Sequence, residues 1–214
     1  MAEINAAEVP QKNPPQPNNI KQSDNIKKYS AILSKFFVEA APAQEADAWE
    51  LPFSVGNRSE ISKIKFVGEY GDYRSSRLAG HRHSGVDIVP ADKSAPLEVY
   101  PAAKGVVCFI TQQEPVKTVI IKHRLKDGST LYTAYIHLKD IFIENGQNVD
   151  EGTKIGVLYT KKEALALGGN FDHLHFEVKK RIDDYSCASW LCMSRAELDE
   201  YFISPRAFFK THLK

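Results

Sequence analysis

The residues of this chain best suited to metal and proton chemistry are histidines that fall into two short clusters. The first cluster runs from His83 to Asp87, the second is His173 with His175, and His137 stands alone between them. Imidazole nitrogens and carboxylate oxygens are ligands that zinc accepts in proteins. Histidine also exchanges protons near neutral pH. The chemistry to expect is therefore that of a metal ion assisted by proton-transferring side chains.

The spacing within each cluster determines how its members could reach one ion. In a strand, His173 and His175 share a face about 6.6 Å apart, so one can bind a metal while the other stands beside it. His83 and Asp87 would also share a face, but a strand separates them by roughly 13 Å, too far for one ion. Gly85 lies between them. Glycine permits a bend or bulge without steric cost, so we expect the chain to fold His83 back over Asp87.

The number of ligands narrows the choice of metal and reaction. Two imidazoles and one carboxylate leave the fourth position of a tetrahedral zinc ion to water, which is typical of catalytic rather than structural zinc sites. Zinc lowers the pKa of its bound water towards about 7 and polarises a scissile carbonyl, so an amide can be hydrolysed at neutral pH. The residues therefore predict a mononuclear zinc hydrolase.

Five short blocks of this sequence resemble the lysostaphin- and LytM-type peptidoglycan metalloendopeptidases. They occur in the order found in that family and fall within roughly residues 70–180. The blocks are residues 83–88 (HSGVDI), 103–107 (AKGVV), 135–138 (YIHL), 149–156 (VDEGTKIG) and 173–178 (HLHFEV). A single His-x-His pair is common in proteins, whereas five ordered blocks form a specific signal.

The resemblance implies a role for each of the five residues. His83, Asp87 and His175 would be the ligands of one Zn²⁺ per chain, and His137 and His173 the two catalytic histidines that do not bind the ion. The family hydrolyses peptide bonds of bacterial cell-wall peptidoglycan, in the stem peptide or the cross-bridge, with the zinc-bound water as nucleophile. One catalytic histidine would move the water's proton to the leaving amine and the other would stabilise the oxyanion. The sequence leaves open which histidine does which.

Two further features concern the substrate groove. Residues 71–74 (GDYR) resemble a family element that ends in arginine, so Tyr73 or Arg74 is expected to line the cleft. Residues 161–167 (KKEALAL) indicate a helical turn where the family has a short Gly/Ser/Thr-rich turn. Such an insertion reshapes the groove, so the bond that is cleaved cannot be inherited from relatives.

The same residues are compatible with two alternative functions. Some proteins of this fold have lost ligands and act as non-catalytic regulators or binding proteins of other cell-wall hydrolases, which implies a regulatory protein partner. Here all five positions are filled, which favours activity, although a segment covering the site would give an autoinhibited protein. The other alternative is a cupin-like iron site built from His81, His83 and Asp87 and completed by a distant histidine. It leaves His137 and the His-x-His pair without a role.

Composition bounds the class of protein. The chain has 214 residues, of which 43% are hydrophobic, enough for one sizeable domain with an appendage. Its 28 Lys and Arg against 27 Asp and Glu give a net charge of +1, so no nucleic-acid partner is expected. No run approaches about eighteen apolar residues, so no membrane span is expected.

The expected location follows from the proposed substrate, which lies outside the cytoplasmic membrane. An extracytoplasmic protein, periplasmic or secreted, is implied, yet residues 1–20 are rich in Pro, Asn and Gln and lack the pattern of a signal peptide. We therefore expect a processed form whose signal has been removed and to which Met1 has been added. In an oxidising compartment Cys187 and Cys192 are able to form a local disulfide, while Cys108 is expected to be a buried thiol.

The hydrophobic pattern predicts a mostly β, antiparallel, sandwich-like metallopeptidase domain with an N-terminal helix and a short C-terminal helix. Strands are expected at residues 97–100, 106–111, 117–124, 129–137 and 173–179, with His123 structural or solvent-facing after an apolar strand. The C-terminal helix should cover residues 196–201, with Ser194 as its cap.

Three regions are expected along the chain. Residues 1–23 should form a disordered or tethering arm, because they are rich in proline and poor in large apolar residues. Residues 24–62 should hold an amphipathic helix, ending near residue 40, and a linker. Residues 63–210 should form the LytM-type catalytic domain.

Overall fold

A computed structural model describes residues 37–39, 41, 44–74, 81–182 and 194–213. The expected N-terminal arm, most of the expected N-terminal helix and the Cys187–Cys192 pair lie outside these residues. The described end of the helical segment is extended. Phe37 forms an antiparallel bridge with Phe109, and the Val38 backbone N–H donates to the carbonyl oxygen of Cys108. Helical structure therefore does not reach residue 37.

The described residues form mainly short strands. The strands are β1 Ile64–Gly68, β2 Tyr73–Arg74, β3 His81–Arg82, β4 Val86–Pro90, β5 Glu98–Val99, β6 Gly105–Thr111, β7 Lys117–Arg124, β8 Thr130–Ile141, β9 Asn148–Val149, β10 Gly156–Leu158, β11 Leu174–Lys179 and β12 Phe202–Ile203. The helices are the 3-10 helix η1 Ile61–Lys63 and the α-helices α2 Lys161–Ala166, α3 Arg195–Tyr201 and α4 Pro205–His212. Each of the five strands predicted from the sequence overlaps an observed strand.

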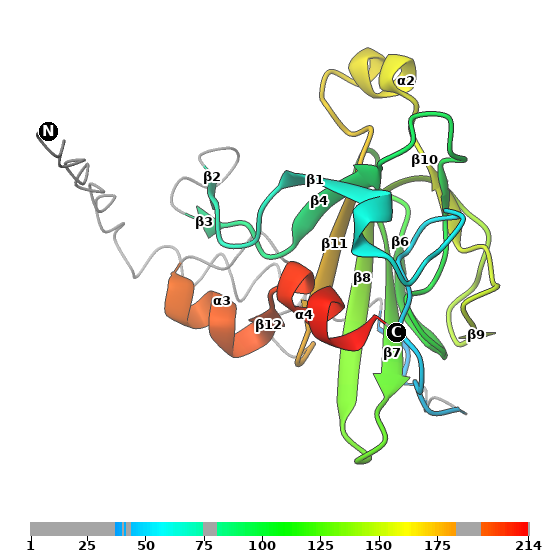
Figure 1. Cartoon of the computed structure of the whole chain (residues 1–214), viewed down its shortest axis with the longest axis vertical. Coiled ribbons are helices and arrows are strands. Elements are labelled where there is room, and N and C mark those ends of the chain that lie inside the picture. Colours follow the sequence, from blue (N-terminus) through cyan, green and yellow to red (C-terminus); the bar gives the residue numbers. More distant parts are fainter. Residues whose placement is uncertain (1–36, 40, 42–43, 75–80, 183–193, 214) are drawn as a thin grey trace, which may run out of the picture.

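Ten of these strands form one antiparallel sheet. Its main path runs β1-β4-β11-β8-β7-β6-β9, with β10 joining β5 to β8 and β12 pairing with β11. The short strands β2 and β3 form a separate two-stranded sheet beside it (Figure 1). The mostly β, antiparallel architecture predicted from the sequence is confirmed. No helix in the described ranges is both long and apolar enough to cross a membrane.

Strand β11 is buried on both faces. Successive side chains alternate between faces, so Leu174, Phe176 and Val178 point together into the main hydrophobic core. The intervening residues, His175 and Glu177, point to the opposite face and are buried there as well. One strand thus supplies both the core and a buried polar layer.

The segment that precedes β1 contributes to the same core. Trp49, Leu51 and Phe53 are buried in it, and Trp49 and Phe53 form isolated bridges with Leu213 and Val99. The core of the described fold therefore begins before residue 63, where the sequence analysis placed the start of the catalytic domain.

Each α-helix begins at a capping residue that is present in the local sequence. Helix α2 confirms the turn predicted at residues 161–167, and Thr160 and Glu163 form its capping box. Helix α3 confirms the predicted C-terminal helix and its Ser194 cap. Helix α4 was not predicted as a helix. It begins with Pro205 in its first turn, a favourable position, after the cap Ser204.

Candidate metal centre

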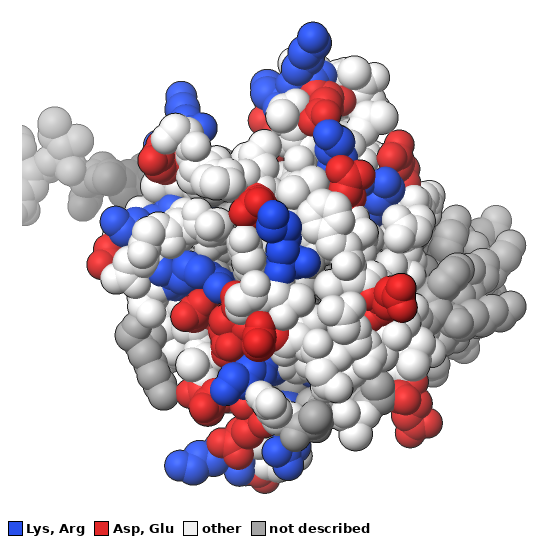
Figure 2. All heavy atoms as spheres, turned by 90° about the vertical axis from the view of Figure 1, so that its right-hand side faces the viewer, with Lys and Arg blue, Asp and Glu red and all other residues white. Residues whose placement is uncertain are grey.

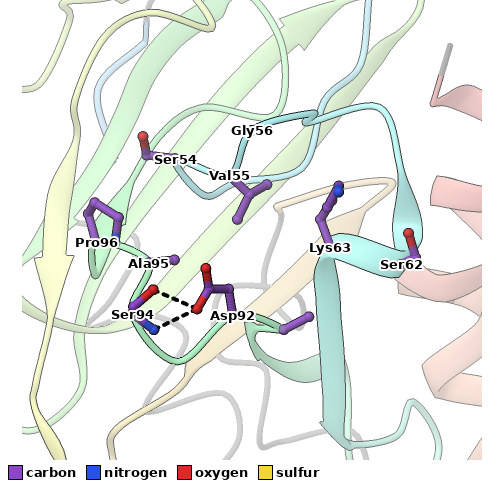
Figure 3. A pocket seen from close by; sticks show the side chains of 10 residues that line it. Ser54, Val55, Gly56, Ser62, Lys63, Asp92, Ser94, Ala95 and Pro96 are labelled. Carbon is purple, nitrogen blue, oxygen red and sulfur yellow. Dashed lines mark hydrogen bonds between the residues drawn. The ribbon is translucent and has the colours of Figure 1, made fainter.

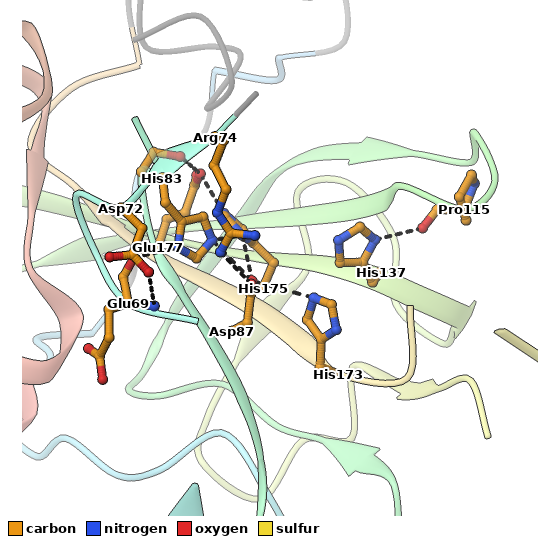
Figure 4. Close-up of polar contacts among 11 residues, drawn as sticks. Glu69, Asp72, Arg74, His83, Asp87, Pro115, His137, His173, His175 and Glu177 are labelled. Atoms are coloured by element: carbon orange, nitrogen blue, oxygen red, sulfur yellow. Dashed lines mark hydrogen bonds and ion pairs between the residues drawn. The ribbon is translucent and has the colours of Figure 1, made fainter. Parts of the chain in front are cut away.

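The sheet places Asp87 and His175 directly opposite each other on β4 and β11. Opposed residues of an antiparallel pair project on the same face. The Nδ1 atom of His175 accordingly lies 3.1 Å from Oδ1 of Asp87, and both residues are buried (Figure 4).

His83 reaches this pair through the bend expected at Gly85. Its Nε2 atom lies 3.1 Å from Oδ1 of Asp87 and 2.9 Å from Nδ1 of His175. The bend depends on glycine, because a Cβ atom on Gly85 would lie 2.3 Å from the carbonyl oxygen of Phe176. Any larger residue would push the His83 turn away from β11.

The three ligand atoms form a triangle that fits one metal ion. Ligands about 2.0–2.1 Å from a tetrahedral zinc ion lie about 3.3 Å apart from one another. The edges of the triangle measure 2.9, 3.1 and 3.1 Å. Within the described ranges, His83, Asp87 and His175 are the one group of three or more His, Cys, Asp or Glu side chains arranged to hold an ion.

The hydrogen bonds of the two histidines direct their lone pairs at this triangle. Nδ1–H of His83 donates to the carbonyl oxygen of Glu69 at 2.7 Å, and Nε2–H of His175 donates to Oε1 of Glu177 at 2.9 Å. In the neutral imidazoles the other nitrogens, which face Asp87, then carry lone pairs. In this neutral form, two lone pairs and a carboxylate converge on one point, which favours a bound cation there, either a proton or a metal ion.

The electrostatics of the cluster agree with this arrangement. Burial would raise the pKa of Asp87, but hydrogen bonds with His173, His175 and His83 hold that pKa well below its usual range. Burial lowers the pKa of His83. Burial alone would also lower the pKa of His175, yet its hydrogen bonds to Asp87 and Glu177 raise it to about 9. A metal ion that binds here therefore displaces a proton.

Arg74 holds the second oxygen of Asp87. Its Nη2 atom lies 2.8 Å from Oδ2, which leaves Oδ1 to the histidines. Gly68 makes room for this contact, because a Cβ atom there would lie 2.3 Å from Oδ2 of Asp87. Of the two residues expected at the cleft, Arg74 thus contacts the cluster. Tyr73 is exposed, with its ring under the guanidinium of Arg82.

His137 occupies an irregular position in β8. Its neighbours Ile136 and Leu138 pair with Thr118 and Lys117, so His137 is the extra residue of a β-bulge, with a φ of 72°. A positive φ is uncommon for residues other than glycine. The Nδ1–H group donates to the carbonyl oxygen of Pro115 at 2.9 Å, which leaves Nε2 as an acceptor. Burial and the neighbouring His173 lower the pKa of His137 to about 3.

His173 lies between His137 and the triangle. Its Nε2 atom is 3.4 Å from Oδ1 of Asp87, and its ring centroid is 5.0 Å from that of His137 (Figure 4). All five residues singled out by sequence are therefore gathered in one place, with two non-triangle histidines on the same side.

Two supporting residues were not identified from the sequence. Glu177 follows His173 and His175 with the same two-residue spacing, so a strand prediction could have placed it on their face. Glu69 contributes its backbone oxygen, for which no side-chain pattern exists. Its carboxylate pairs with Arg206 of α4, whose Nε lies 3.1 Å from Oε2 of Glu69.

Other surfaces offer fewer ligands. A pocket of about 670 Å³ is lined by residues including Ser54, Lys63, Asp92 and Ser94 and by none of the five (Figure 3). Its carboxylate already accepts hydrogen bonds from the backbone and hydroxyl of Ser94. On the face shown in Figure 2, basic and acidic side chains intermingle without a continuous stripe of either sign.

Comparisons with known proteins complete the description of this site. No curated protein matches the sequence. Solved structures that match include a zinc-containing peptidase from Vibrio cholerae (24% identity, 64% of this chain, 38% of that chain, TM-score 0.43). Lysostaphin, an antimicrobial peptidase from Staphylococcus simulans, matches at 18% identity over 71% of this chain and 51% of that chain, with a TM-score of 0.44. A chain of the SpoIIIAH–SpoIIQ complex matches at 16% identity over 75% of this chain and 99% of that chain, with a TM-score of 0.44.

This chain spans about half or less of the length of the first two proteins. The family comparison concerns the region of the histidine cluster itself. Residues 81–186 match peptidase family M23, and through this region the chain belongs to that family.

Proposed function

We propose that this protein is a zinc-dependent endopeptidase that hydrolyses peptide bonds of bacterial cell-wall peptidoglycan outside the cytoplasmic membrane. The observation that carries the proposal is the triangle of His83 Nε2, Asp87 Oδ1 and His175 Nδ1, with edges of 2.9 to 3.1 Å. Membership of peptidase family M23 supports hydrolysis of a peptide bond.

Zinc fits the donor set better than calcium or magnesium does. Two imidazole nitrogens and one carboxylate oxygen are a frequent catalytic zinc set, whereas calcium and magnesium prefer oxygen ligands. The outer contacts of His83 and His175 fix which nitrogen of each ring is available. When bound, zinc would act as a Lewis acid that polarises the scissile carbonyl and eases deprotonation of water.

His137 and His173 would transfer the proton of the attacking water and stabilise the oxyanion. Nε2 of His137 is its available nitrogen, because Nδ1–H is engaged by Pro115. His173 stands beside Asp87, with Nε2 directed at the triangle. One imidazole would accept the proton of the attacking water and deliver it to the leaving amine. The other would donate a hydrogen bond to the oxygen on which negative charge develops.

Helix α2 would form part of the groove wall. Glu163 on this helix pairs with Lys139 of β8 at 2.6 Å, two residues beyond His137. The insertion is thereby attached to the strand that carries a catalytic histidine. The bond that is cleaved would depend on this wall.

The test is digestion of purified sacculi of several wall chemistries by the zinc-loaded full chain, followed by mass spectrometry of the released fragments. We expect peptides with new amino and carboxyl ends at one bond, and none from the His175→Ala variant. A full chain that retains zinc but releases nothing from any sacculus would contradict the proposal. Release only after removal of residues 1–36 would instead support an autoinhibited member of the family.

A further inference from the structure

The polar face of β11 carries three consecutive buried ionisable side chains. His175, Glu177 and Lys179 are 8%, 0% and 1% exposed. Charged groups in a protein interior are unfavourable unless each is paired or hydrogen-bonded. The partners of these three side chains therefore indicate the role of this buried layer.

Glu177 connects the two segments that carry the histidine ligands. Its Oε1 atom accepts one hydrogen bond from Nε2–H of His175 at 2.9 Å and another from the hydroxyl of Ser84 at 2.6 Å. Ser84 is the neighbour of His83, and the turn rests directly on the carboxylate side chain, since a Cβ atom on Gly85 would lie 2.9 Å from Cγ of Glu177. One oxygen atom thus fixes β11 and the His83 turn relative to each other.

Lys179 is the counter-ion of this carboxylate. Its Nζ atom lies 2.8 Å from Oε2 of Glu177 and 4.3 Å from the centroid of the Phe202 ring. Phe202 belongs to β12 and pairs in register with Lys179. The ammonium group is therefore enclosed between the carboxylate and an aromatic ring.

Stability alone is a weak reason for such a pair. Replacing a buried ion pair by apolar residues of similar volume is often neutral or stabilising. Here, however, Glu177 of the pair accepts a hydrogen bond from Nε2–H of His175, the ring nitrogen that faces away from the metal triangle. Outer contacts of this kind orient a ligand histidine and increase its affinity for the metal.

We propose that Glu177 and Lys179 are positioning residues of the metal centre. Glu177 orients His175 and the His83 turn, and Lys179 holds Glu177 in place as its buried counter-ion. Together they raise the affinity of the triangle for the metal. This inference rests on the proposed function for the identity of the ion, whereas both residues are buried from solvent.

The experiment compares zinc affinity, by chelator competition, in the full chain and in Glu177→Gln, Lys179→Met and the double variant. Loss of an outer contact typically lowers metal affinity about 10–100-fold, and we expect this range for Glu177→Gln. Lys179→Met should lower it less. Because Lys179 acts through Glu177, the double variant should bind zinc no more weakly than Glu177→Gln alone.

A matched control is Lys180→Met, which removes the next lysine along the chain. Lys180 is exposed and its Nζ donates to the backbone oxygen of Asp199. The zinc affinity of the Lys180→Met variant should equal that of the unaltered chain. The absorption spectrum of the Co²⁺-loaded proteins gives a second readout, which should change for Glu177→Gln and not for Lys180→Met.

A purely structural role predicts lower thermal stability with unchanged zinc affinity and an unchanged cobalt spectrum, and that result would overturn the inference. Should a single variant fail to fold, the double variant, which buries no unpaired charge, provides the decisive affinity. An unaltered chain that binds no zinc would instead overturn the proposed function. Zinc binding without wall hydrolysis, with the expected loss in Glu177→Gln, would support the positioning role alone.

Discussion

Oδ1 of Asp87 and Nδ1 of His175 are 3.1 Å apart because the two residues face each other across the β4–β11 pair. Their relation is therefore fixed by strand register rather than by flexible loops. A slip of one residue would turn one of the two side chains to the opposite face. This edge of the ligand triangle is consequently as rigid as the centre of the sheet.

Replacing one of these ligands should abolish retention of zinc. Both His175→Ala and Asp87→Ala leave only two protein ligands, which hold zinc weakly. Metal analysis of the protein after gel filtration should give about one zinc per unaltered chain and almost none for either variant. His212→Ala, which alters a histidine on α4, should retain the metal. Full zinc retention by both ligand variants would exclude this site.

Replacing His137 should separate metal binding from turnover. Asparagine tolerates the positive φ found at this position and cannot act as a base at neutral pH. We expect His137→Asn to keep its zinc and to lose about 10²–10⁴-fold in the rate of wall-peptide hydrolysis. Rates should be measured on a purified muropeptide at saturating zinc. Near-normal hydrolysis would remove His137 from the catalytic machinery.

Replacing Arg74 should weaken the metal centre without removing a ligand. In Arg74→Gln, Oδ2 of Asp87 loses its ion pair at 2.8 Å, so the carboxylate is free to rotate. We expect zinc affinity to fall about tenfold or more. The matched variant is Arg82→Gln, whose guanidinium contacts the backbone oxygen of Gly71. Equal affinities for the two variants would mean that Arg74 does not orient Asp87.

Acid should destabilise the fold through His123. This residue is fully buried, between the carbonyl oxygen of Lys104 and the hydroxyl of Thr133, and burial lowers its pKa to about 4. In the unfolded chain the pKa is about 6.5. Between these two pKa values, His123 is protonated in the unfolded state and neutral in the folded state. The free energy of unfolding should therefore fall as pH drops from about 6.5 to about 4, by about 3 kcal/mol from this group.

Urea unfolding at several pH values between 7 and 4 measures this effect. His123→Gln should be less stable at pH 7 but should lose less stability on acidification than the unaltered chain. The same loss in both proteins would assign the acid sensitivity to other groups.

The position of a truncation should decide whether the shortened chain folds. A chain that begins at residue 37 keeps the buried Trp49, Leu51 and Phe53, whereas one that begins at residue 61 loses all three. Loss of a large buried side chain costs about 3–5 kcal/mol, and total stabilities are about 5–15 kcal/mol. We expect cooperative thermal unfolding for the first and not for the second. Cooperative unfolding of both would mean that this segment is dispensable.

The sequence predicted those parts of the site that depend on local pattern. Two-residue spacing predicted a strand through His173 and His175, and the structure has His175 in β11 with His173 just before its first residue. Gly85 predicted the bend that returns His83 to Asp87. The bulge at His137 was not predicted, because it arises from how β8 pairs with β7 rather than from the residue itself. Contacts between distant segments, such as Arg206 with Glu69, likewise leave no periodic signal.

Helix α4 supports the metal centre from behind without contributing a ligand. Its Arg206 grips the carboxylate of Glu69, whose backbone oxygen orients His83, and its Phe209 stacks on Phe176, the residue that follows His175. Loss of helix α4, for example through proteolytic cleavage before Pro205, should therefore weaken zinc binding and any hydrolysis that depends on it. All five histidine and aspartate residues of the cluster would remain chemically intact.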